Sequence, residues 1–112
     1  MAQIETTEAM LQLDELATVP GVDLFVGPAD LAASFGVPGN TQHPLVREAS
    51  ERVVKAARAN GKCVATACAP NDFKFWLDQK IDLLFCTNDI ASLKRGAGLA
   101  LDEARAALSE VK

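Results

Sequence analysis

"DLFVGPADLAASFGVPGN", residues 23–40, runs from an apolar segment into the start of a helix. The run VDLFVG is apolar apart from Asp23, which is typical of a parallel strand buried on both faces. Gly27 and Pro28 end this run, and we expect a short helix over residues 31–35. Asp30 therefore follows directly after a buried strand, where functional side chains gather in parallel α/β folds.

The same strand-to-helix order extends on both sides of this stretch. AQIE, residues 2–5, reads as the end of a strand, and a capping Thr6 or Thr7 then starts a helix that stops before Pro20. Later strands are predicted in KCVATAC and IDLLFCT. The intervening helices begin at Pro44, at Asn71 or Asp72, and at Asn88 or Asp89, and Gly61 closes the first of these.

Strands that alternate with helices predict βαβ units and a parallel sheet. Four such strands are half the number in an eight-stranded α/β barrel, so we expect an α/β half-barrel formed by one domain over residues 1–112. The last helix is predicted to bury one side against the sheet, formed by Leu93, Ala97, Ala100, Leu101, Ala104 and Leu108.

Composition excludes several classes of protein. The net charge is −4, which argues against a nucleic-acid or anionic-membrane partner because binding phosphates calls for a basic face. No apolar run has the length of a membrane span, and no signal pattern opens the chain. Three cysteines without CxxC spacing indicate reduced thiols, so we expect a cytoplasmic protein.

Two carboxylates follow neighbouring strands. Glu5 ends the first strand and Asp30 follows the second, and adjacent strands lie about 4.8 Å apart. The pair could share one hard cation such as Mg²⁺ or Mn²⁺. Gly27 lets a ligand approach the backbone, and the amides of Ala29, Asp30 and Leu31 could receive a substrate carboxylate. Equally, Glu5 could be an exposed strand-end residue and Asp30 a helix cap, and spacing alone does not separate these interpretations.

Three segments together resemble one known family. QIET-EA at residues 3–9, GPADL at residues 27–31 and PGN-QHP at residues 38–44 are similar to the HpcH/HpaI aldolases. The resemblance is dense from Gln3 to Pro44 and looser to about Ala100. It implies the second half of a (β/α)₈ barrel, strands five to eight and the terminal helix. It also implies a divalent-metal-dependent lyase that cleaves 4-hydroxy-2-oxo or 2-keto-3-deoxy acids to pyruvate and an aldehyde.

The resemblance assigns roles by position. Glu5 and Asp30 match metal-binding residues, and the implied cofactor is Mg²⁺, Mn²⁺ or Co²⁺. Gln3 matches a glutamine beside the bound keto acid, and the loop that meets the pyruvate carboxylate matches Gly27, Pro28 and Ala29. In the implied mechanism the metal stabilises the enolate as a Lewis acid.

The resemblance also shows departures. The family's base histidine and an arginine that contacts the keto acid match no residue of this sequence, so no catalytic residue is assigned. His43 is interpreted as a cap for the helix at Pro44. The family has serine at Ala32 and glycine near Lys80 and Thr87, and replacing a glycine that needs unusual backbone angles costs about 1 kcal/mol.

Two hypotheses of different classes remain. The chain is part of a pyruvate aldolase, or it is a non-catalytic half-barrel that binds metal and a small keto acid or serves in assembly. A half sheet has two unpaired edges, which promote pairing with another chain. We therefore expect a homo-oligomer or a missing N-terminal half rather than a free monomer.

Overall fold

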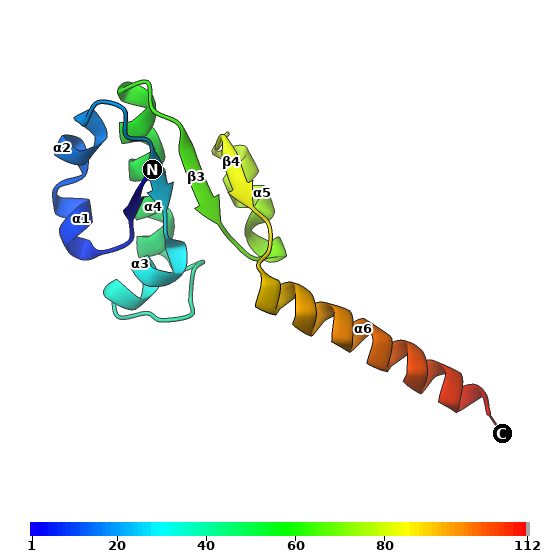
Figure 1. Ribbon diagram of the computed structural model, residues 1–112. Coiled ribbons are helices and arrows are strands. Elements are labelled where there is room, and N and C mark those ends of the chain that lie inside the picture. Colours follow the sequence, from blue (N-terminus) through cyan, green and yellow to red (C-terminus); the bar gives the residue numbers. More distant parts are fainter. Residues whose placement is uncertain (112) are drawn as a thin grey trace.

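The computed structural model describes residues 1–111 and contains one four-stranded parallel sheet with six α-helices (Figure 1). The strands β1 (Ala2–Ile4), β2 (Leu24–Val26), β3 (Val64–Ala67) and β4 (Leu83–Phe85) lie side by side in chain order. Each pair of consecutive strands is connected by at least one helix, so the chain consists of β–α–β units as predicted. Four parallel strands in this order make half of a (β/α)₈ barrel.

Helices cover one face of the sheet, and the other face is open. On the covered face the strand side chains are fully buried: Ile4, Leu24, Val26, Val64 and Thr66. On the opposite face Leu83 and Phe85 are about half exposed, and Gln3 and Ala67 are exposed too. In a closed barrel this second face is the interior, so the half-barrel presents its interior side chains to solvent.

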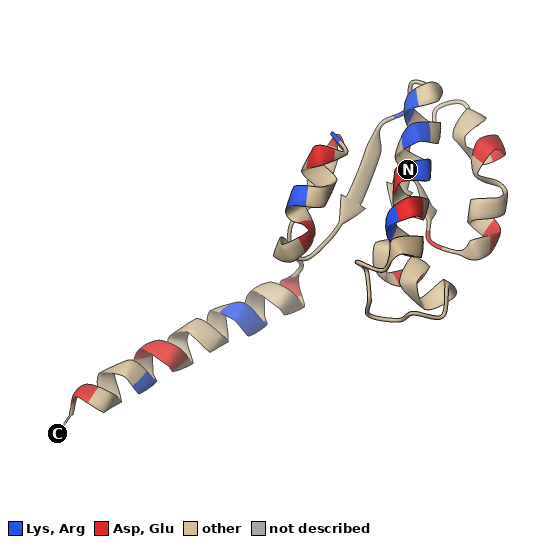
Figure 2. Ribbon diagram, turned by 180° about the vertical axis from the view of Figure 1, so that it is seen from behind, with Lys and Arg blue, Asp and Glu red and all other residues tan. Residues whose placement is uncertain are grey.

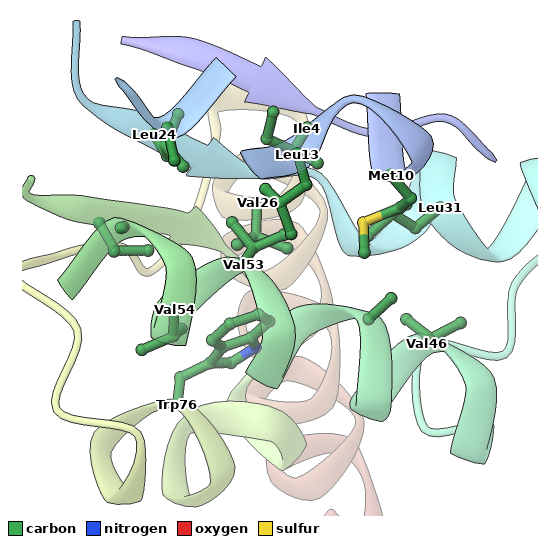
Figure 3. Packing of buried hydrophobic residues seen from close by; sticks show 14 of the residues in the cluster. Ile4, Met10, Leu13, Leu24, Val26, Leu31, Val46, Val53, Val54 and Trp76 are labelled. Atoms are coloured by element: carbon green, nitrogen blue, oxygen red, sulfur yellow. The ribbon is translucent and has the colours of Figure 1, made fainter. Parts of the chain in front are cut away.

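The core lies between the sheet and the helices (Figure 3). The helix α4 (Pro44–Ala59) packs against β2 and contributes Val46, Val53 and Val54 to the core. Leu13 of α2 (Leu13–Thr18) and Trp76 of α5 (Phe73–Asp78) complete this layer.

Several predicted helix starts are confirmed. The side-chain oxygen of Thr6 accepts a bond from the Ala9 N–H and begins α1 (Thr7–Leu11). His43 Nδ1 accepts from the Leu45 N–H at the start of α4, and Asn88 Oδ1 accepts from the Ala91 N–H at the start of α6 (Asp89–Glu110). These side chains satisfy N–H groups that have no partner within the helix.

Three predictions about helices need correction. The first helix breaks at Gln12 into α1 and α2, because Gln12 leaves the helical conformation. The third helix, α3 (Pro28–Ser34), starts earlier than expected. Asp72 is the last residue of a short 3₁₀ turn, η1 (Pro70–Asp72), and precedes α5, but its side chain makes no cap bond and has other partners.

The prediction that α6 buries one side is wrong. No residue of α6 is buried, and the helix extends away from the sheet as an arm (Figure 1). The molecule measures 66 × 28 × 22 Å with a radius of gyration of 18.0 Å. A compact domain of this length has a radius of gyration of about 13 Å, so the arm accounts for the excess. Charges of both signs are spread along it (Figure 2).

Lys80 has a backbone conformation that L-residues rarely adopt. Lys80 lies at the turn between α5 and β4, and its φ is 55°. Among residues 1–111 no other non-glycine residue has a positive φ. The expectation that glycine would suit this position is therefore confirmed. No described helix is long and apolar enough to cross a membrane.

Candidate functional site

Two of the predicted site residues, Glu5 and Gly27, lie next to each other at the carboxyl ends of β1 and β2. Ile4 lies beside Val26 in the parallel ladder, and the Gly27 N–H continues it by donating to the Ile4 carbonyl at 3.0 Å. Glu5 therefore follows β1 where Gly27 follows β2. Glu5 is partly buried, and Gly27 and Pro28 are buried.

Gly27 packs closely against Gln3 and Glu5. A Cβ atom added at Gly27 would lie 2.9 Å from Glu5 Cβ and 3.2 Å from both Gln3 Nε2 and Glu5 Oε2. Any larger residue would push these two side chains aside. The absence of a side chain at Gly27 thus allows Gln3 and Glu5 to share this edge of the sheet.

Asp30 lies one turn further along, in the first turn of α3. Its side chain and Ala29 are exposed, beside the buried Gly27–Pro28 pair. The Leu31 N–H already donates to the Gly27 carbonyl at 2.9 Å. Leu31 is therefore not a free donor for a substrate carboxylate, which corrects that part of the prediction.

The residues around this edge offer two carboxylates to a cation. Within residues 1–111, no cluster of three or more His, Cys, Asp or Glu side chains has the arrangement of a metal centre. Glu5 is partly buried and Asp30 is exposed. Hard cations such as Mg²⁺ take one or two protein carboxylates with water or substrate oxygens. The donor set fits a cation that shares its ligands with substrate.

A cavity of about 640 Å³ lies at the carboxyl ends of β3 and β4. Phe25 and Phe85 form its apolar wall, with ring centroids 5.7 Å apart, and Arg95 of α6 is its charged residue. Cys68 and Cys86 also line it. None of the residues assigned from the sequence to the metal and keto-acid site lines this cavity. Sequence reasoning therefore missed it as a site, although its position after two predicted strands was a usable signal.

A buried carboxylate, Asp72, lies near Cys68 of this cavity. Asp72 accepts hydrogen bonds from Thr41 Oγ1 at 2.8 Å, from Gln42 Nε2 at 3.0 Å and from the Arg47 guanidinium. Burial raises the pKa of Asp72, but these hydrogen bonds outweigh it and hold the pKa below its usual range. The cluster fastens the loop after α3 to the segment after β3.

Cys68 is a weak nucleophile in this setting. Burial raises the pKa of its thiol to about 11, and the nearby Asp72 carboxylate and Cys86 add to the shift. A protonated thiol is a poor nucleophile, so the structure gives no support for Cys68 as an attacking group in catalysis at neutral pH.

The fold and this edge of the sheet can be compared with known proteins. The family model for HpcH/HpaI aldolase/citrate lyase matches residues 1–79. The chain belongs to this family. The match includes β1, β2 and β3 and therefore the whole Gln3–Asp30 edge.

Curated relatives of the chain are aldolases. The chain is 56% identical over 50 residues to a hydroxypyruvate/pyruvate aldolase of Sagittula stellata, covering 44% of this chain and 20% of that protein. It is 49% identical over 63 residues to a 4-hydroxy-2-oxo-heptane-1,7-dioate aldolase of Escherichia coli, covering 55% and 24%. A pyruvate aldolase of Rhizobium etli is 52% identical over 63 residues, covering 55% and 25%. The matched segments thus span a quarter or less of these relatives.

Solved structures of the family share the fold. A HpcH/HpaI aldolase/citrate lyase family protein from Burkholderia cenocepacia superposes with a TM-score of 0.85 at 35% identity, covering 92% of this chain and 41% of that one. An HpcH/HpaI aldolase from Desulfitobacterium hafniense gives 0.85 at 30% identity, covering 94% and 42%. The half-barrel therefore corresponds to about two fifths of each structure.

Proposed function

We propose that this chain forms the metal- and 2-keto-acid-binding part of a carbon–carbon lyase. The reaction would cleave a 4-hydroxy-2-oxo or 2-keto-3-deoxy acid to pyruvate and an aldehyde. The observation that carries the proposal is the close packing of Gly27 against Gln3 and Glu5 at the carboxyl edge of the sheet. The aldolase names of the curated relatives support the reaction class.

Glu5 and Asp30 are the residues that would hold the cation. Both carry hard oxygen donors, and Mg²⁺, Mn²⁺ and Co²⁺ are the ions proposed for them. When bound, a divalent cation supplies Lewis acidity toward the carboxylate and keto oxygens of a 2-keto acid. The accessible position of Asp30 leaves room for substrate oxygens in the same coordination sphere.

Gln3, Gly27, Pro28 and Ala29 would position the keto acid. The exposed Gln3 amide can donate to a substrate oxygen while Gly27 keeps the backbone free of side chain beside Glu5. The Ala29 N–H, in the first turn of α3, is the donor we propose for the substrate carboxylate.

A second candidate function is metal and keto-acid binding without turnover. His43 is the one histidine of the sequence, and its Nδ1 accepts the Leu45 N–H at a helix start. The sequence therefore has no further histidine to act as a base beside Glu5 and Asp30. This observation favours a binding or assembly role for the chain by itself, with turnover requiring groups supplied by another polypeptide segment.

Assembly with a second copy is part of the proposal. One side of α6 carries Ile90, Leu93, Leu101 and Leu108, each at least 50% exposed. These positions fall on one face of a helix with 3.6 residues per turn. An apolar stripe of this length on a free arm is suited to packing against another protein surface, and we propose that a second copy of the chain provides it.

Metal binding and turnover should be measured separately. Isothermal titration with Mn²⁺, with and without pyruvate, reports binding, and a retro-aldol assay with coupled pyruvate detection reports turnover. Glu5→Gln and Asp30→Asn should each weaken Mn²⁺ binding, whereas Asp14→Asn on the exposed side of α2 should not.

The outcomes separate the two functions. Turnover that disappears in both site variants supports the lyase. Binding without turnover supports the binding module. Mn²⁺ affinity that is equal in Glu5→Gln, Asp30→Asn and Asp14→Asn would contradict the carboxylate pair and both functions built on it.

A further inference from the structure

Two cysteines occupy neighbouring positions just beyond β3 and β4. Ala67 pairs with Phe85 in the parallel register, and the Cys68 N–H donates to the Phe85 carbonyl at 3.3 Å. This bond belongs to the Ala67–Phe85 pair, so the next residues of the two strands, Cys68 and Cys86, follow side by side at the end of the ladder. Neighbouring strands lie about 4.8 Å apart, within the Cα separation of about 4.4–6.8 Å that a disulfide spans.

Both cysteines line the same cavity, and Cys86 lies near enough to contribute to the raised pKa of the Cys68 thiol. Residues paired laterally in a parallel sheet point to the same side, and Cys68 and Cys86 both line the cavity beside Arg95. Both are free thiols in the structure. Cys86 is exposed, and its Sγ lies 3.6 Å from the Leu84 carbonyl, whereas Cys68 is partly buried.

We propose that Cys68 and Cys86 are a redox-active dithiol that a small-molecule disulfide, such as oxidised glutathione, converts to an intramolecular disulfide. The Cys86 thiolate attacks one sulfur of the small disulfide, whose S–S bond breaks and releases one small thiolate. The Cys68 sulfur then loses its proton and attacks Cys86 Sγ, and the second small thiolate leaves. The two cysteines lose two protons and two electrons, and one small disulfide becomes two thiols.

The environments of the two thiols set this order. Cys86 is open to solvent and can meet a bulky disulfide, whereas Cys68 lies against the core. Burial and the neighbouring Asp72 keep Cys68 protonated, so it reacts slowly with reagents in solution. Its position beside Cys86 makes the second step intramolecular, which compensates for the low thiolate fraction.

Cys63 provides a matched control within the same strand. It directly precedes β3, and its N–H donates to Asp23 Oδ1 at the other end of the sheet. Five residue steps along an extended strand separate Cys63 from Cys68 by about 16 Å. In the native fold Cys63 can therefore pair with neither of the other two cysteines.

The unfolded chain has the opposite preference. For a flexible chain, closure of the five-step loop between Cys63 and Cys68 is favoured about sevenfold over the eighteen-step loop between Cys68 and Cys86. A native preference for the longer loop would therefore come from the fold and not from chain proximity.

The experiment is oxidation of the whole chain by oxidised glutathione, in buffer and in concentrated urea, followed by alkylation and peptide mass spectrometry without reduction. In buffer we expect the Cys68–Cys86 link, a mass loss of two hydrogens and an alkylated Cys63. In urea the Cys63–Cys68 link should predominate. Cys68→Ser should leave glutathione attached to Cys86, and Cys63→Ser should form the native link at the wild-type rate.

Circular dichroism of each variant shows whether the fold is kept. A native chain that accumulates glutathione on Cys86 without closing the ring overturns the proposal. So do links that involve Cys63, links between two chains, or equal product ratios in buffer and urea. The readout is chemical and does not depend on any lyase activity.

Discussion

The guanidinium of Arg47 donates a hydrogen bond from Nη2 to Asp72 Oδ1 and joins α4 to the segment after β3. Its Cζ also lies 3.9 Å from the centre of the Phe75 ring. The Asp72 side chain is 3% exposed and that of Arg47 is 20% exposed. A charge this far from water is stable only while its partners remain, and this dependence leads to the first prediction.

Removing the positive charge of Arg47 alone should destabilise the fold more than removing the charges of Arg47 and Asp72 together. Arg47→Met keeps much of the side-chain stem but leaves the Asp72 carboxylate with two neutral donors, Thr41 and Gln42. We expect a loss of about 2–3 kcal/mol in the free energy of unfolding, because a buried carboxylate loses its counter-ion. Urea unfolding followed by circular dichroism measures it. The double variant Arg47→Met/Asp72→Asn should be less destabilised than Arg47→Met, and equal losses in the two would contradict this account.

The same carboxylate predicts a pH dependence. Its pKa is lower in the folded state than in the unfolded chain, so the ionised form stabilises the fold above the unfolded value of about 3.9. This contribution is lost as the pH falls through the folded-state pKa. The stability advantage of the wild type over Asp72→Asn should therefore be larger at about pH 6 than at about pH 3. A difference that stays constant over this range would show that Asp72 does not titrate as the structure implies.

Gly27 gives a test of the edge formed by β1 and β2. The Cβ of Gly27→Ala would lie 2.9 Å from Glu5 Cβ, so the strand ends or the Glu5 side chain must move. We expect a loss of about 1–3 kcal/mol in stability from this overpacking, together with weaker Mn²⁺ binding. Gly98→Ala in α6 is the control, since a Cβ there meets nothing within 4 Å and should favour the helix. An equal change in Mn²⁺ affinity in the two variants would show that metal binding does not depend on the packing at Gly27.

The fold should be at least as stable with glycine at position 80 as with lysine. The φ of 55° at Lys80 strains an L-residue, and the Arg58 bond to the Lys80 carbonyl uses only the backbone. Lys80→Gly removes the strain but gives the unfolded chain more freedom, and we expect a net gain of up to about 1 kcal/mol. Thermal unfolding measures it, with Lys62→Gly as the comparison at a position of ordinary φ. A loss of stability as large as that of Lys62→Gly would contradict the strain.

Local patterns in the sequence predicted most of the fold because they act over a few residues. Thr6, His43 and Asn88 cap helices through atoms two or three residues away, so the sequence contains both partners. Gly27 and Pro28 mark the end of β2 for the same reason. The motif around Asp30 placed it correctly after the second strand.

Features that depend on distant partners were not predictable in the same way. Asp72 reads as a helix cap, but it is turned instead toward Arg47, 25 residues earlier. The neighbouring positions of Cys68 and Cys86 depend on the register of β3 and β4, which no local pattern specifies. The cavity at these strand ends, with Arg95 arriving from α6, likewise needs the tertiary arrangement.

The apolar face of α6 was predicted correctly as a face but wrongly as buried within the chain. Periodicity predicted Leu93, Leu101 and Leu108 on this face, to which the structure adds the exposed Ile90, but it does not say which surface covers the stripe. In the single chain these side chains are 76%, 50%, 71% and 75% exposed. An isolated helix of this length that contains Gly96 and Gly98 is only marginally stable in water.

This marginal stability gives the last prediction. Amide hydrogens of α6 should exchange rapidly at low protein concentration, because the helix opens without disrupting the core, whereas those of α4 should be protected. If a second copy covers the stripe, protection of α6 and the mass measured by light scattering should rise together with concentration. Leu93→Gln/Leu101→Gln should abolish both increases, while Leu99→Gln on the opposite face of the helix should preserve them. Protection of α6 that is independent of concentration in all three proteins would contradict assembly through this stripe.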